Sequence, residues 1–158
     1  MTSKTSVVAD PASPTILITR LFDAPPHLVW RTLTEPELVK QWAAHCTMEW
    51  ITCDLDVRPG GAWRELLRMN GQDHGFRGEY REVVPYERLI RTRIYDPYPD
   101  AEALETVTLT EVDAQTKLQV TLRHKTMEAR DHHLRAGMDE GVRVTHAQLE
   151  ALLATLKR

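Results

Sequence analysis

Four polar residues stand among apolar neighbours in segments with strand-like patterns: Glu65, Tyr80, Thr92 and His124. A carboxyl group and an imidazole on one surface could form an acid–base pair, provided that they can reach each other. Two other roles stay open, because a buried carboxylate is costly unless it is paired or protonated. Glu65 could be partly solvated or hydrogen-bonded within the fold, and His124 could be a satisfied core or strand-end histidine. We therefore name no catalytic residue and regard all four as candidate ligand contacts.

The remaining candidate ligand contacts are four large apolar residues and one glycine: Trp42, Trp63, Leu67, Met138 and Gly141. Apolar pockets with a few polar groups are the usual sites for small molecules. Large apolar side chains that face a helix are, however, core residues by default. Contact with a ligand and ordinary core packing are thus the two alternatives for these positions.

The histidines and cysteines do not have the spacing of a metal site. His132 and His133 are adjacent and would point in two directions from a helix. His45, Cys46 and Cys53 lack the C-x-x-C or H-x-x-x-H spacing of zinc ligands. We expect no metal ion and no cofactor.

Nucleophilic and phosphate-binding motifs are not found either. Serine occurs only at three positions in the first 13 residues, which argues against a Ser-His-Asp triad. The glycines of Arg58–Gly61 lack the G-x-x-x-x-G-K-[ST] pattern and a following helix, so they indicate a tight turn. Cys46 has no activating partner in the sequence and is expected to be inert.

Composition indicates one ordinary globular domain. The chain has 158 residues, 42% hydrophobic and 27% charged, with a net charge of -3 that gives no reason to expect a nucleic-acid partner. No apolar run approaches the roughly 18 residues of a membrane span, and two cysteines suit a reducing cytoplasm. Residues 1–14 resemble a frayed tail rather than a signal peptide, which leaves 15–158 as a single domain.

Strand patterns dominate the first two-thirds of that domain. Residues 15–22 are rich in β-branched and large apolar types, and 23–42 contain two short helices that begin near prolines. From about Thr47 to Thr126, six further strand-like segments follow one another with short turns. The sequence therefore predicts an antiparallel sheet of about seven strands.

Strand alternation assigns side chains to a helix-facing and a water-facing side. His124 shares the apolar face of Leu118 and Leu122, and Glu65 shares the face of Trp63. Arginine is rarely buried without a partner, so arginines are predicted to face water. These arginines are Arg64, Arg68, Arg77, Arg81, Arg91 and Arg93. The residues placed inside on the neighbouring positions are Phe76, Gly78, Tyr80, Ile90, Thr92 and Ile94.

The C-terminal segment predicts an amphipathic helix over about 139–157, long enough to cover the sheet. Gly137 is expected to end a preceding turn formed by residues 129–136. Gly141 lies on the predicted buried side of the helix. It could allow tight packing of helix on sheet, or it could leave room for a ligand between them.

The order of these elements resembles the START-like, or helix-grip, superfamily. The closer resemblance is to the activator of Hsp90 ATPase homologue 1-like family in its stand-alone bacterial form. The residues that carry it are FDAPPHLVWRTLTEPELVKQW, DVRPGGAWR, GEYREVVPYERL, TKLQVTLRH and ARDHHLRAGMDEGVRVTHAQLEALL. The resemblance implies an α+β fold of the Bet v 1 type, in which a curved sheet grips the long helix around a cavity.

Three functions follow from this resemblance. The first is a binding protein for a small apolar or amphipathic molecule held between sheet and helix. The second is a co-chaperone of an Hsp90-type ATPase, although the N-terminal domain of the eukaryotic activators is expected to be absent here. The third is an enzyme related to polyketide cyclases and hydratases, with the same cavity. A homodimer also stays open.

Overall fold

The computed structural model describes residues 4–45 and 47–157. Alternating apolar and polar residues form one antiparallel sheet, as the sequence predicts. Its strands are β1 (Ser6–Ala9), β2 (Thr15–Phe22), β3 (Glu49–Leu55), β4 (Ala62–Met69), β5 (Gln72–Val84), β6 (Arg88–Tyr95), β7 (Ala103–Val112) and β8 (Gln115–Arg123). They lie in the order β1-β2-β8-β7-β6-β5-β4-β3, so β1 and β3 form the two edges.

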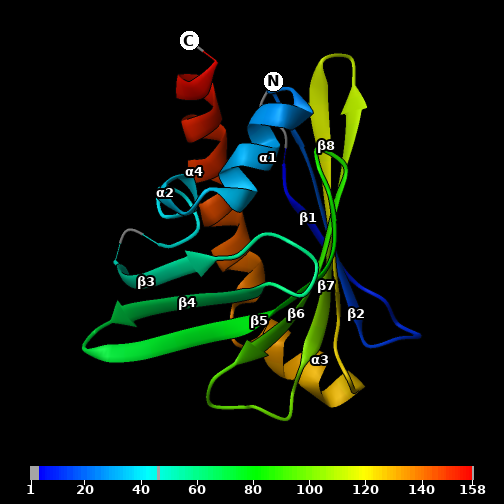
Figure 1. Ribbon diagram of the computed structural model, residues 1–158. Helices are drawn as coiled ribbons and strands as arrows, with labels where there is room; N and C mark the ends of the chain where they lie inside the picture. Colours follow the sequence, from blue (N-terminus) through cyan, green and yellow to red (C-terminus); the bar gives the residue numbers. More distant parts are fainter. Residues whose placement is uncertain (1–3, 46, 158) are drawn as a thin grey trace.

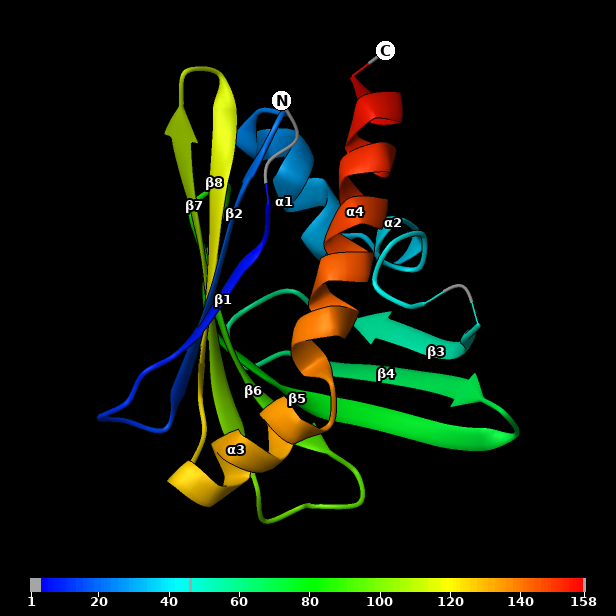
Figure 2. The same cartoon turned by 180° about the vertical axis from the view of Figure 1, so that it is seen from behind.

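The helices of the described residues lie on one face of this sheet. They are α1 (Pro26–Thr34), α2 (Pro36–Val39), α3 (Met127–Arg135) and α4 (Met138–Leu156). Figure 1 shows β3, β4 and β5 turning away from β2, β7 and β8, so that the curved sheet wraps around α4; Figure 2 shows the same arrangement from behind. The predicted α+β architecture is confirmed. No helix in the described part of the chain is long and apolar enough to cross a membrane.

The segment predicted as a frayed tail contains strand β1, which makes eight strands instead of seven. β1 pairs with β2 from Ser6 opposite Thr19 to Ala9 opposite Ile16. Just before it, the Thr5 hydroxyl lies 3.0 Å from Nδ1 of a histidine in α4, His146. The prediction was wrong here because long-range contacts order these residues, and local pattern does not record such contacts. Residues 1–3 of the predicted tail lie outside the described residues.

A second difference is α3, which occupies most of the predicted turn at residues 129–136. The Thr126 hydroxyl caps it by accepting a hydrogen bond from the backbone N–H of Ala129 at 3.0 Å. Gly137 then has φ 86°, the left-handed conformation that favours glycine. This residue ends α3 and starts α4 in a new direction, as predicted.

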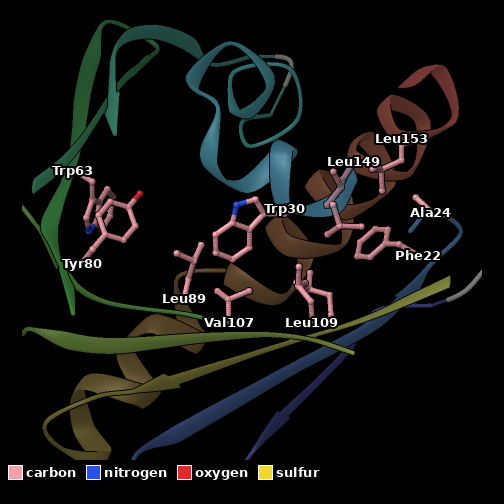
Figure 3. Packing of buried hydrophobic residues seen from close by; sticks show 12 residues of the cluster. Phe22, Ala24, Trp30, Trp63, Tyr80, Leu89, Val107, Leu109, Leu149 and Leu153 are labelled. Carbon is pink, nitrogen blue, oxygen red and sulfur yellow. The ribbon is translucent and has the colours of Figure 1, made fainter. Parts of the chain in front are cut away.

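Buried side chains of the sheet and helices form two clusters. The larger one joins α1, α4 and both halves of the sheet, and Figure 3 shows Trp30 between Trp63 and Tyr80 on one side and Leu149 on the other. The smaller one contains Ile16, Ile18 and Leu122, with Leu134, Met138 and Val142 packed against it. Trp63, Tyr80 and Leu89 thus join the sheet half that includes β4, β5 and β6 to the larger cluster.

Gly141 does not face the sheet. A Cβ built on it would lie 3.2 Å from Nε2 of His45, in the segment after α2. Neither predicted role of this glycine, tight packing on the sheet or room for a ligand beside it, matches that neighbour. Position 141 of α4 faces the segment after α2 instead. Helix periodicity does not show where that segment lies.

The two glycines around the start of α4 should respond oppositely to alanine. Gly137→Ala should lower the free energy of unfolding by about 1 kcal/mol, because an L-residue is strained at positive φ. Gly141→Ala should raise it by up to about 1 kcal/mol through helix propensity, once the flexible His45 side chain shifts slightly. Urea unfolding of both variants measures the changes. Equal signs would contradict this description of the helix start.

Candidate functional site

Strand β6 presents its arginines to the inner face, opposite to the prediction. Arg91 is paired in register with Glu105 of β7. Its guanidinium carbon lies 3.7 Å from the centroid of the Trp63 ring, which is buried on the inner face of β4. Since side chains alternate along a strand, Arg93 shares this face and Thr92 lies on the other. The prediction failed because arginine can be buried where carboxylates pair with it.

Four charged side chains meet on this face: Glu65, Arg91, Arg93 and Glu105, here called the inner ion cluster. Nε of Arg91 donates to Oε1 of Glu105 at 2.6 Å, and Nη1 of Arg91 lies 3.8 Å from Oε2 of Glu65. Nη1 of Arg93 lies 3.7 Å from the other Glu105 oxygen. The side chains retain exposed fractions of 14%, 16%, 27% and 10% in the order named. Solvent therefore reaches the cluster although it faces the interior.

The Trp63 ring packs directly against the guanidinium of Arg91. Its indole N–H donates to the Thr92 carbonyl oxygen at 2.9 Å. A Cβ on Gly78 would lie 2.5 Å from the indole nitrogen and 1.9 Å from that carbonyl oxygen. The glycine thus allows the ring to lie across β5, where it makes a cation–π contact with Arg91. Leu67, further along β4, is also buried.

The Tyr80 hydroxyl is a polar group without a hydrogen-bond partner among the described residues. The side chain is fully buried. Burial raises the pKa of Tyr80, while the nearby guanidinium of Arg91 opposes that rise. Arg91 is therefore a charged neighbour of the hydroxyl. An unpaired buried polar group costs free energy, which a hydrogen-bond partner would recover.

The two carboxyl groups beside Arg91 have different electrostatic environments. Burial raises the pKa of Glu65, and the charges of Arg91 and Arg93 offset this only in part. Burial would also raise the pKa of Glu105, but the same two arginines outweigh it and lower the value. Glu105 is thus the firmly ionised partner of Arg91, and Glu65 is the group that takes up a proton more readily.

This difference should be visible in a titration of the glutamate side-chain carboxyl carbons by NMR. We expect Glu65 to titrate above the ordinary glutamate pKa and Glu105 below it, because Glu105 has the shorter contact with Arg91. Glu65→Gln should remove the higher transition and leave the lower one. A Glu65 transition at or below that of Glu105 would contradict the arrangement.

His124 belongs to a different contact. Its Nε2 lies 3.2 Å from Nδ1 of His133 in α3. Burial, followed by the charge of Arg93, lowers the pKa of both rings, that of His133 to about 3. The two histidines are therefore neutral near pH 7. The acid–base pair of Glu65 and His124 is not formed, because each side chain has another partner.

Three other candidate residues lie apart from the inner ion cluster. Trp42 donates from Nε1 to the Thr32 carbonyl oxygen at 2.8 Å and packs on the larger core cluster. Met138 packs on the smaller core cluster beside β2 and β8. Gly141 faces His45. Of the predicted ligand contacts, the structure brings together Trp63, Glu65 and Tyr80, with Leu67 on the same strand.

Two hollows of the described residues are open and lie on the surface. One, of about 370 Å³, is lined by residues 97–101 and by 125, 126 and 129 at the start of α3. The other, of about 260 Å³, is lined by Pro14, residues 102–104 and residues 123–125. Of the predicted ligand contacts, only His124 lines either of them.

Arg91, Arg93 and Glu105 are the site residues that the sequence analysis missed. A signal for them exists in β7, where Glu105 alternates with Val107 and Leu109 and must share their inner face. A carboxylate on an apolar face requires a cation nearby. The arginines of the adjacent strand are the cations that meet this requirement.

The described cysteine, Cys53, lies in β3. Burial raises the pKa of the Cys53 thiol to about 11, which keeps it protonated and unreactive. Cys46, predicted to be inert, lies outside the described residues. Among the described residues, no group of three or more His, Cys, Asp or Glu side chains could hold a metal ion.

Known proteins share the fold and part of the sequence. A family model described as "Activator of Hsp90 ATPase homolog 1-like protein" matches residues 23–154. A Rhodobacter sphaeroides protein is 27% identical, with a TM-score of 0.88 over 97% of this chain and 100% of that chain. Protein NE0264 from Nitrosomonas europaea is 29% identical, with a TM-score of 0.83 over 94% of this chain and 99% of that chain.

A likeness to protein Ms6760 from Mycobacterium smegmatis, at 24% identity and a TM-score of 0.86 over 95% of this chain and 96% of that chain, shows the fold alone. No curated protein matches the chain, so these comparisons carry family and fold but no activity. The family match extends from the start of α1 almost to the end of α4. This protein therefore belongs to the activator of Hsp90 ATPase homolog 1-like family, within the START-like helix-grip fold.

Proposed function

We propose that this protein binds a small amphipathic molecule on the inner face of the sheet, with the polar group of the ligand at the inner ion cluster. The observation that carries the proposal is the meeting of Arg91 and its two carboxylates with the unpartnered Tyr80 hydroxyl, on a face that solvent still reaches. Charged groups with perturbed pKa values in such a position are characteristic of functional sites.

A purely structural role explains this cluster less well. A buried ion pair is weak as a source of stability, because the desolvation of both charges offsets their attraction. Apolar residues at these positions would give comparable or greater stability. Binding of a polar ligand group by Tyr80 and Glu65 would explain why charged residues occupy these positions, whereas stability alone does not explain it.

The apolar part of the ligand would contact the residues around the cluster. Trp63 and Leu67 are on the same face of β4, and Phe76 of β5 is half-buried beside them. Pockets that combine such apolar surface with a few polar groups suit small molecules. The proposal includes a cytoplasmic location and no nucleic-acid partner, in agreement with the cysteine content and the net charge of -3.

Native mass spectrometry of protein purified without added ligand tests the proposal. We expect a fraction of the molecules to carry a small organic molecule, and we expect Tyr80→Phe and Glu65→Gln to reduce that fraction. Loss of one polar contact corresponds to about fivefold weaker binding. Glu79→Gln is the matched control, because Glu79 is exposed on the outer face of β5.

Protein that is free of small molecules, and that binds none when mixed with a panel of amphiphiles before the measurement, would exclude a ligand at this site. Equal losses in Glu65→Gln and Glu79→Gln would place any bound molecule away from the inner ion cluster.

A further inference from the structure

We infer that the ligand is an organic acid with an aromatic body, and that Arg93 binds its acidic group. This inference rests on the proposed function and specifies the class of ligand. It follows from three features of the inner face: the unequal sharing of Glu105 between two arginines, the free donors of Arg93, and a row of aromatic rings that leads from Arg93 to the surface.

Of the two arginines in the inner ion cluster, Arg93 is the one whose charge is less compensated. Arg91 takes the short contact with Glu105, at 2.6 Å, and also lies near Glu65. Arg93 has only the remaining Glu105 oxygen, at 3.7 Å, which exceeds hydrogen-bond distance. Its guanidinium donates no hydrogen bond to the described residues, although it has five N–H groups to donate. It is also the most exposed member of the inner ion cluster, at 27%.

The surroundings of Arg93 favour a carboxylate. The guanidinium carbon of Arg93 lies 4.6 Å from the centroid of the Phe76 ring. This cation–π contact places the N–H donors of the guanidinium beside an apolar surface. The charge of Arg93 also acts on His124 and His133, whose pKa values it helps to lower. A planar carboxylate can accept two parallel hydrogen bonds from a guanidinium, which makes it the matching acidic group.

The aromatic rings continue from this point to the protein surface. Phe76 stacks on Tyr95 with a centroid distance of 5.0 Å, and Tyr95 lies 5.9 Å from Tyr98. Tyr98 is 49% exposed and meets the His132 ring edge-on at 5.3 Å. An apolar ligand body that extends outward from Arg93 would therefore contact aromatic faces, which favour another aromatic ring by offset or edge-on stacking.

Isothermal titration calorimetry with 2-naphthoate and 2-naphthalenemethanol tests the inference, because the two compounds share the ring system and differ in charge. We expect naphthoate to bind wild-type protein about tenfold more tightly, as for one charge-assisted hydrogen-bonded pair. Arg93→Gln should bring the ratio of the two affinities close to one, and Arg93→Lys should retain part of the preference. Arg77→Gln is the control, because Arg77 is bound to Asp96 on the outer face.

The outcomes separate the inference from the proposed function. Equal affinities for the two compounds in wild-type protein, or a preference that survives in Arg93→Gln, would overturn the role of Arg93 while binding itself remains. Binding of neither compound would also overturn the inference, and the mass-spectrometric measurement then decides the proposed function separately. A circular dichroism spectrum of each variant establishes that the fold is intact.

Discussion

Arg91→Met should lower the free energy of unfolding by about 3–5 kcal/mol, the largest stability effect expected of any single substitution described above. The substitution leaves Glu105 only 10% exposed and without its 2.6 Å partner. It also removes the cation from the Trp63 ring. Urea unfolding monitored by tryptophan fluorescence measures the change.

Two comparisons make this prediction specific. Arg31→Met breaks an exposed i,i+4 pair between α1 and Glu35 and should leave the free energy of unfolding nearly unchanged. The double variant Arg91→Met/Glu105→Gln should recover much of the loss, because the buried carboxylate that loses its hydrogen-bonded partner is then neutral, with only Arg93 at 3.7 Å left beside it. If Arg91→Met costs as little as Arg31→Met, the inner ion cluster is not a desolvated pair in solution.

Acidification from pH 7 to pH 4 should destabilise the wild-type protein by roughly 3 kcal/mol more than a His146→Gln variant. His146 is 5% exposed in α4, and burial together with the charge of Arg20 lowers its pKa to about 4. The folded state therefore binds this proton less readily than the unfolded state, whose pKa is 6.5. The contribution of neutral His146 to the free energy of unfolding is complete above pH 6.5. It is lost as the pH falls from 6.5 to about 4.

The contacts of His146 explain why protonation is unfavourable. Its Nδ1 lies 3.0 Å from the Thr5 hydroxyl, which also accepts a hydrogen bond from Arg20 at 3.2 Å. A second positive charge there would face Arg20, while Glu150 is 3.9 Å from that arginine. Urea unfolding at a series of pH values gives the comparison, with His27→Gln, an exposed position in α1, as control. Parallel pH profiles for wild type and His146→Gln would refute the prediction.

Patterns that are local in the sequence determined most of the fold. Alternation gave the strands from β2 to β8, and the 3.6-residue period gave α4 to within one residue at each end. The same alternation placed Trp63 and Tyr80 inside, where both are buried. These predictions succeeded because each depends on the burial of one face of one element, and the sequence of that element records which face is apolar.

The charged part of the candidate site was decided by tertiary structure. The sequence of β6 alone offers alternating arginines, and an arginine without a visible partner is expected to face water. The register that sets Arg91 opposite Glu105, and the sheet order that brings Glu65 near it, reverse that expectation. Similarly, the contact of His146 with Thr5 depends on the pairing of β1 with β2, which brings the start of the chain to α4. Whether a charge is buried depends on a partner distant in the chain, and that partner is fixed only when the strands pair.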